Sequence, residues 1–278
     1  MTVLVFTLLV FAGSTAAGLL GALTGLGGGV VLVPLLTLAF HVDLRYAIGA
    51  SLISVIATSS GSAAAYVREG YSNVRIGMFL EIATTLGALL GAFLAARVPT
   101  RALAVIFGTV LIYSAWLSWQ SAPADTEAKA NPWSGRLRLS GSYPGRTGET
   151  IEYKADRIPA GFVTMFGAGT LSGLLGIGSG AVKVLAMDRI MRIPFKVSTT
   201  TSNFMIGVTA AASAGIYLKR GYIDPGLAAP VLLGVLLGSL VGARLLTRAR
   251  VAVLRAVFAV VILSLGIEMI AGGWTGKL

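Results

Sequence analysis

The sequence predicts an all-α, polytopic membrane protein made of two inverted repeats, each with four long helices and one short, glycine-broken helix. Its 278 residues are 55% hydrophobic and 12% charged, with a mean hydropathy of +0.84. A soluble domain carries roughly 25% charged and about 45–50% apolar residues. Long apolar runs and an internal duplication of the chain complete the prediction.

The apolar runs give the predicted elements in order. Two short ones, 29–40 and 180–190, each follow a glycine cluster directly and cannot comfortably cross a bilayer alone. Residues 121–158 form a long polar linker that alternates around a Pro-Gly turn, which leaves a small hairpin or a disordered connector open. The linker separates a first membrane repeat (1–120) from a second (159–278). Eight runs approach or reach the ~20 residues of a membrane crossing: 3–24, 47–67, 75–96, 101–120, 159–175, 198–218, 225–246 and 251–271.

The two repeats are visible in the sequence itself. A shift of 151 positions aligns residues 17–97 with 168–248 without a gap, and 23 of the 81 aligned pairs are identical. The glycine cluster "GLGGG" (25–29) then coincides with "GIGSG" (176–180), and Ser51 coincides with Ser202. The chain therefore contains two homologous halves.

Charge predicts how the halves are oriented. If each glycine cluster reverses the chain, the halves are inverted, and a cytoplasmic linker places fourteen Lys and Arg inside against six outside. This agrees with the positive-inside bias of membrane proteins. If the clusters only interrupt crossing helices, the halves are parallel and the asymmetry almost vanishes. We therefore expect a multi-pass protein of the cell (inner) membrane with a cytoplasmic linker and both termini outside.

Several functions are excluded by composition. The net charge of +11 would suit nucleic acid, but the Lys and Arg lie mostly in loops between apolar runs, so no nucleic-acid partner is expected. The chain has no cysteine and one histidine, His41, which leaves no thiolate or histidine cluster for a metal. No catalytic constellation and no nucleotide-binding motif is present. We expect neither an enzyme nor a cofactor.

The glycine clusters predict an anion site. Secondary transporters built from inverted repeats use interrupted helices whose N-termini point at the substrate near the bilayer midplane. Glycine permits the turn and leaves backbone N–H groups uncovered, and these groups together with the helix dipole attract an anion. Close helix packing through small residues is the alternative. The candidate binding residues are Gly25, Gly27, Gly28, Gly29, Gly176, Gly178, Ser179 and Gly180.

The paired "GLGGG" and "GIGSG" motifs, the proline after the first, the duplicated halves and the length together resemble the sulfite exporter TauE/SafE family. The resemblance covers nearly the whole chain except the linker. It implies transport or export of small sulfur-containing or organic anions such as sulfite or sulfoacetate. The second cluster departs from the pattern, with Ser179 in place of a central glycine and Leu185 in place of the proline.

Polar residues inside the apolar runs extend the candidate site. Lys183 lies in the first turn of the second short helix and is interpreted as an anion ligand. The alternatives are an ion pair with Glu81 or Asp188, or a side chain that snorkels to the membrane interface. Glu81 is a candidate for carrying a proton in a coupled cycle. Ser51, Ser202 and Asn203 are further donors to an oxyanion, although the polar run 198–203 could instead cap a helix.

The sequence thus predicts a secondary transporter that moves a small anion through a midplane site between two glycine-broken helices. An anion channel and a non-transporting membrane scaffold are the alternatives. The expected partners are the anion and the lipid bilayer, and the oligomeric state is left open.

Overall fold

The structure is a computed structural model that describes residues 2–24, 28–68, 72–119, 139–144, 149–246 and 251–276. All eight predicted long helices form, each with ends within about four residues of the apolar run. The long helices are α1 (Val3–Thr24), α3 (Leu44–Arg68), α4 (Val74–Ala95), α5 (Thr100–Trp119), α7 (Ile158–Leu175), α9 (Phe195–Lys219), α10 (Pro225–Leu246) and α11 (Val251–Thr275).

Both predicted short segments are helical and are built alike. In the first half, α2 (Gly29–Pro34) passes into a π-helical turn, η1 (Leu35–Ala39). In the second half, α8 (Gly180–Leu185) passes into η2 (Ala186–Ile190). These bounds differ by 151 residues at every point, so Leu185 in place of the proline leaves the path of the helix unchanged.

The outer surface has the character of a membrane protein. Within the described residues, α1, α4, α7 and α10 each contain a segment long and apolar enough to cross a bilayer. Large apolar side chains such as Leu86, Phe93, Leu237 and Leu240 point outward from these helices. An apolar surface of this extent is stable in lipid and not in water. The chain is therefore a multi-pass, helical membrane protein.

Helices of one half pack in parallel against helices of the other. α10 lies along α1, and a methyl group at Gly18 would come within 2.5 Å of the Val235 carbonyl. The contact of Gly169 with the Thr84 carbonyl, where α7 lies along α4, is its equivalent one repeat later. In both pairs, contacts that lie later along one helix also lie later along the other, so the two helices are parallel. Gly18 and Gly169 are repeat mates, and so are Thr84 and Val235, so each contact is the counterpart of the other. A two-fold relation between the halves requires this.

Repeat mates pack against each other in antiparallel fashion. In the α5·α11 pair, Gly108 approaches Gly266, and Gly273 approaches Arg101. A later position in α11 thus meets an earlier position in α5, so the two helices are antiparallel. In the α3·α9 pair, the Ser59 hydroxyl lies by the backbone of α9 near its middle, whereas Gly49 approaches Tyr222, beyond the end of α9. Antiparallel mates are the arrangement that inverted repeats need. Inversion across a membrane stays a prediction that this packing supports.

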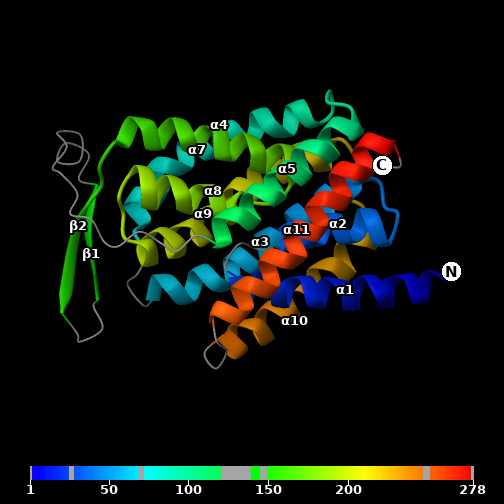
Figure 1. The fold of residues 1–278 in the computed structure, drawn as a ribbon, viewed down its shortest axis with the longest axis horizontal. Coiled ribbons are helices and arrows are strands. Elements are labelled where there is room, and N and C mark those ends of the chain that lie inside the picture. The colour runs from blue at the N-terminus through cyan, green and yellow to red at the C-terminus, as the bar shows by residue number, and fades with distance from the viewer. Residues whose placement is uncertain are drawn as a thin grey trace.

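The linker contains a small hairpin, one of the two structures that its sequence left open. β1 (Ser140–Pro144) and β2 (Thr150–Lys154) pair in antiparallel register, Ser140 opposite Lys154. Tyr143 and Tyr153 are buried against the ends of α4 and α9, and the Asn73 side-chain amide donates to Tyr153 Oη at 2.7 Å. Burial raises the pKa of Tyr153, and this hydrogen bond opposes the rise. The hairpin lies at the end of the helices opposite to both termini (Figure 1).

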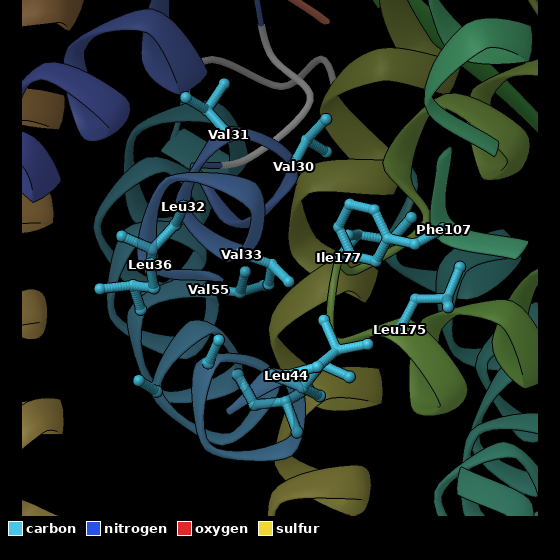
Figure 2. Close-up of a cluster of buried hydrophobic side chains, with 14 of the residues drawn as sticks. Val30, Val31, Leu32, Val33, Leu36, Leu44, Val55, Phe107, Leu175 and Ile177 are labelled. Carbon is cyan, nitrogen blue, oxygen red and sulfur yellow. The ribbon is translucent and has the colours of Figure 1, made fainter. Parts of the chain in front are cut away.

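The short helix α2 is enclosed in the main apolar core. Its side chains from Val30 to Val33 are all buried, together with Leu36 of η1. In Figure 2 they lie in one cluster with Val55 of α3 and, from the other half, Ile177 of the second glycine cluster. The core therefore joins the two glycine clusters across the middle of the molecule.

Candidate functional site

The second glycine cluster ends α7 with three left-handed residues. Gly176 has φ +68°, Gly178 has φ +71°, and Ser179 has φ +47°. Side chains other than glycine rarely adopt this region, so glycine is required at the first two positions. Ser179 accepts the same strain, and its buried hydroxyl has no hydrogen-bond partner among the described residues.

After each cluster the chain runs back along the helix that precedes it. In the second half, the N–H of Asp156, just before α7, donates to the Met191 carbonyl at 2.9 Å, and Met191 closes η2. In the first half, Phe40 at the end of η1 stacks edge-on against Phe6 near the start of α1, with ring centroids 5.9 Å apart. α2 therefore does not continue α1, and α8 does not continue α7. The sequence analysis predicted this reversal from the glycine clusters.

The first cluster reaches the second through a close contact. Gly25 and Gly27 lie outside the described residues; Gly28 has φ −65°, and Gly29, which opens α2, is likewise not left-handed. Conformational freedom is therefore not the reason for glycine at 28 and 29. A methyl group on Gly29 would lie 2.6 Å from Ser51 Oγ and 3.1 Å from the Gly176 carbonyl, so absence of a side chain lets the two breaks touch.

Both predicted serine donors bond to backbone carbonyls of the second glycine cluster. Ser51 Oγ donates to the Gly176 carbonyl at 2.8 Å, and Ser202 Oγ donates to the Gly180 carbonyl at 3.3 Å. Both side chains are buried. The repeat mates Ser51 and Ser202 therefore both bond to the second cluster.

Asn203 is placed between the central helices of the two halves. It is largely buried, and its backbone carbonyl accepts a hydrogen bond from Ser59 Oγ at 2.5 Å. Helix capping does not explain the polar run around it, because the N-cap of α9 is Pro194, which has no side-chain cap. Most hydroxyls of the run instead bond to carbonyls of the preceding turn or to the break.

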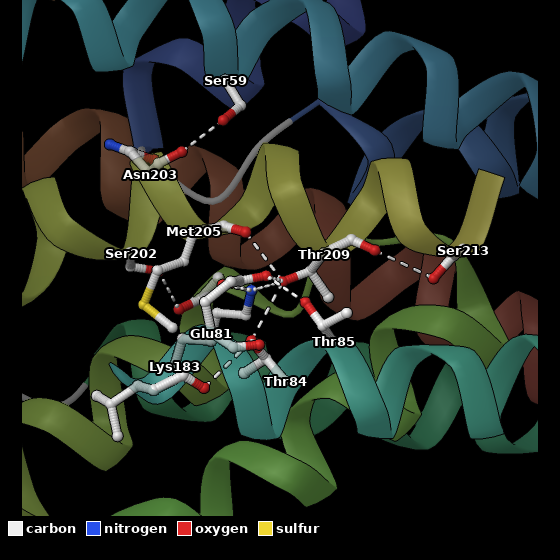
Figure 3. Close-up of polar contacts among 12 residues, drawn as sticks. Ser59, Glu81, Thr84, Thr85, Lys183, Ser202, Asn203, Met205, Thr209 and Ser213 are labelled. Carbon is white, nitrogen blue, oxygen red and sulfur yellow. Dashed lines mark hydrogen bonds and ion pairs between the residues drawn. The ribbon is translucent and has the colours of Figure 1, made fainter. Parts of the chain in front are cut away.

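Lys183 and Glu81 form a buried ion pair (Figure 3). Lys183 Nζ lies 3.9 Å from Glu81 Oε2, and the two side chains are 0% and 6% exposed. Thr209 of α9 connects them: Lys183 donates to its hydroxyl, and its hydroxyl lies 2.6 Å from Glu81 Oε1. Of the two ion-pair partners weighed for Lys183, the structure selects Glu81.

Thr209 was not among the residues predicted from the sequence, although its spacing from Ser202 and its place in the duplication both point to it. Thr209 stands seven residues after Ser202, two helical turns along the same face of α9. Its repeat mate is Thr58, so it is also one of the identical positions of the duplication. Thr85, which donates to Glu81 Oε1 at 3.2 Å, had no comparable signal.

The arrangement combines two glycine breaks with buried charge. Two chain reversals meet in the core, and α8, which follows the second, carries the only lysine within the described short helices. Charged residues at such depth are costly and mark functional sites in membrane proteins. The structure thus shows a polytopic helical membrane protein with an ion pair buried at its centre.

The comparisons with known proteins identify the family. The model of the family described as "Sulfite exporter TauE/SafE" matches residues 10–269. The chain belongs to this family. No solved structure matches it.

Relatives extend over nearly the full chain. The "Probable membrane transporter protein YunE" of Bacillus subtilis (strain 168) is 29% identical over 277 residues, covering 96% of this chain and 98% of its own. "Probable membrane transporter protein YdhB" of the same organism is 27% identical, covering 82% and 85%. A "Probable membrane transporter protein" of Xylella fastidiosa (strain 9a5c) is 24% identical, covering 93% and 91%.

Proposed function

We propose that this protein is a secondary transporter of a small anion, sulfite or a related sulfur-containing or organic anion. The observation that carries the proposal is the contact of two glycine breaks in the core, beside a fully buried lysine. The family is described as a sulfite exporter, which supports sulfite as the first substrate to test.

The binding site that we propose lies between the breaks. Backbone N–H groups of Gly178, Ser179 and Gly180, together with those of Gly28 and Gly29, attract the anion, and Lys183 supplies a full positive charge. The N–H of Gly176 donates to the Ser172 carbonyl and closes the end of α7. Hydroxyls of Ser51 and Ser202 turn from the Gly176 and Gly180 carbonyls toward the anion when it binds, and the side-chain amide of Asn203 donates to it. Such irregular backbone is stable at membrane depth only where protein or water satisfies it.

Our proposal for the membrane places both short helices as re-entrant segments in two inverted repeats. Antiparallel packing of repeat mates supports inversion, and the reversals at the breaks support re-entry. The excess of Lys and Arg on the linker side supports a cytoplasmic linker, with both termini outside the cell (inner) membrane.

Transport is tested with purified protein in liposomes. Radiolabelled sulfite is added outside, and uptake is followed against concentration, with protein-free liposomes as the control. A carrier gives a rate that saturates. A rate that rises without saturation identifies an anion channel, and absence of flux with sulfite, sulfoacetate and simple sulfonates leaves a membrane scaffold.

Orientation gives a second prediction. A protease site inserted between β1 and β2, at residues 145–148, is expected to resist cleavage by protease added to intact cells and to be cut after the cells are opened. The matched control is the same site appended after Leu278, which is expected to be cut in intact cells. Cleavage of the hairpin site from outside would reverse the proposed orientation.

A further inference from the structure

The ammonium group of Lys183 has unused hydrogen-bonding capacity. An ammonium carries three N–H donors. One donates to Thr209 Oγ1, and Glu81 Oε2, at 3.9 Å, is beyond hydrogen-bond distance. The lysine has no other acceptor among the described residues and is 0% exposed. Two N–H donors of a buried cation therefore lack an acceptor, which is costly unless a ligand supplies one.

The two carboxylate oxygens of Glu81 also differ in the hydrogen bonds that they accept. Oε1 accepts from Thr209 at 2.6 Å and from Thr85 at 3.2 Å, whereas Oε2 accepts no hydrogen bond. A proton added at Oε2 would leave both bonds to Oε1 intact. It would also convert Oε2, the oxygen that faces Lys183, from an acceptor into a donor.

These observations point to a shared site, and the inference rests on the proposed function. We infer that Lys183 pairs either with ionised Glu81 or with the transported anion, and that the anion binds only when Glu81 takes up a proton at Oε2. The anion then accepts from Lys183 Nζ and from the Oε2–H group, and Thr209 keeps its position between the two side chains.

Charge balance makes the two events inseparable. Without anion, Lys183 (+1) and Glu81 (−1) sum to zero. With a monovalent anion and protonated Glu81, Lys183 (+1) and the anion (−1) again sum to zero. Anion without proton leaves the pocket at −1, and proton without anion leaves it at +1. A net charge at this depth carries a large desolvation cost, so both of these states are disfavoured.

Among the described residues, the ion pair of Lys183 is with Glu81, and the other charged groups of the surrounding elements stand at other positions. α7, which packs on α4 and α8, has no charged residue between Ile158 and Leu175. On the remaining elements packed against the pair, the charged residues are near helix ends or in the following turn: Arg75 of α4, Arg101 of α5, Asp188 and Arg189 of η2, and Lys196 and Lys219 of α9. Glu81 is thus the acid within reach of Lys183 that can balance the anion.

The consequence is a one-to-one cotransport of a monovalent anion and a proton, in which no net charge crosses the membrane. A pH gradient then drives accumulation of the anion, and the membrane potential does not. The experiment uses a sulfonate, methanesulfonate, because sulfite itself takes up protons near neutral pH. Radiolabelled methanesulfonate flux is measured in proteoliposomes with an imposed pH gradient, or with a potassium potential set by valinomycin.

For the wild type, an acidic outside is expected to raise initial uptake at least tenfold, and the valinomycin potential to change it less than twofold. Glu81→Gln, which stays uncharged, is expected to transport without pH-gradient stimulation and to become sensitive to the potential. Glu81→Asp is the matched control and keeps the proton coupling. Proton-gradient stimulation that survives in Glu81→Gln, or wild-type flux driven by the potential, overturns the inference.

Binding measurements test the inference even if Glu81→Gln fails to fold. Purified wild-type protein in weakly buffered detergent solution, mixed with saturating methanesulfonate, is expected to take up about one proton per protein, read with a pH indicator dye. Binding without proton uptake overturns the coupling and leaves anion transport standing. Absence of binding and flux for both sulfite and methanesulfonate removes the proposed function, and this inference with it.

Discussion

Lys183→Met is expected to abolish anion transport and to destabilise the protein. The substitution keeps most of the side-chain volume but leaves Glu81 buried without its counter-charge. Removing one partner of a buried ion pair costs about 3–5 kcal/mol, less whatever the carboxyl regains by taking up a proton. Sulfite flux in proteoliposomes and thermal unfolding in detergent measure the two effects.

The double variant Glu81→Leu, Lys183→Met separates the two roles of the lysine. With both charges gone, apolar side chains fill the space, and replacement of a buried pair in this way is neutral or stabilising by about 1–4 kcal/mol. Stability is therefore expected to return while transport stays absent. Transport by the double variant at the wild-type rate would show that the ion pair is structural and that the anion binds elsewhere.

Much of the fold could be predicted because the physical signals are local. Apolar runs set the long helices, and the 151-residue duplication identified the two short helices as equivalents before any contact was known. Alternation around a Pro-Gly turn allowed the hairpin without excluding a disordered connector. Parallel packing of α1 with α10 could not be read in this way, because small residues spaced along a helix show that some close neighbour exists and not which one.

The candidate site was predicted in part, for a related reason. Gly176 and Gly178 have the left-handed backbone that their glycines suggested, but Gly29 is needed for close contact with Ser51 and the second break, which involves residues far apart in sequence. Lys183 was predicted as a site residue only because it is a charged residue within an apolar run. Its connection through Thr209 depends on the rotation of α9 about its axis, and packing against α4 and α3 sets that rotation.

Gly173→Ala is expected to destabilise the protein strongly, because α7 and α4 touch backbone to backbone at this point. A methyl group on Gly173 would overlap the Ala88 carbonyl oxygen, and it would lie 2.8 Å from the Ala88 carbonyl carbon. Backbone atoms cannot turn aside as a side chain can, so the helices must separate. Overpacking of this kind costs about 1–3 kcal/mol, and occasionally more.

Gly167→Ala, on the same helix, is the matched control for Gly173→Ala. Gly167 is exposed, and a methyl group there would meet no atom within 4 Å. Alanine in a helix interior is favoured over glycine by about 0.5–1 kcal/mol, so this variant is expected to unfold at the wild-type temperature or above. Since α4 carries Glu81 and α7 leads into the second break, separation at Gly173 is also expected to reduce sulfite flux. Equal melting temperatures of the two variants in detergent would contradict the close packing of α4 on α7.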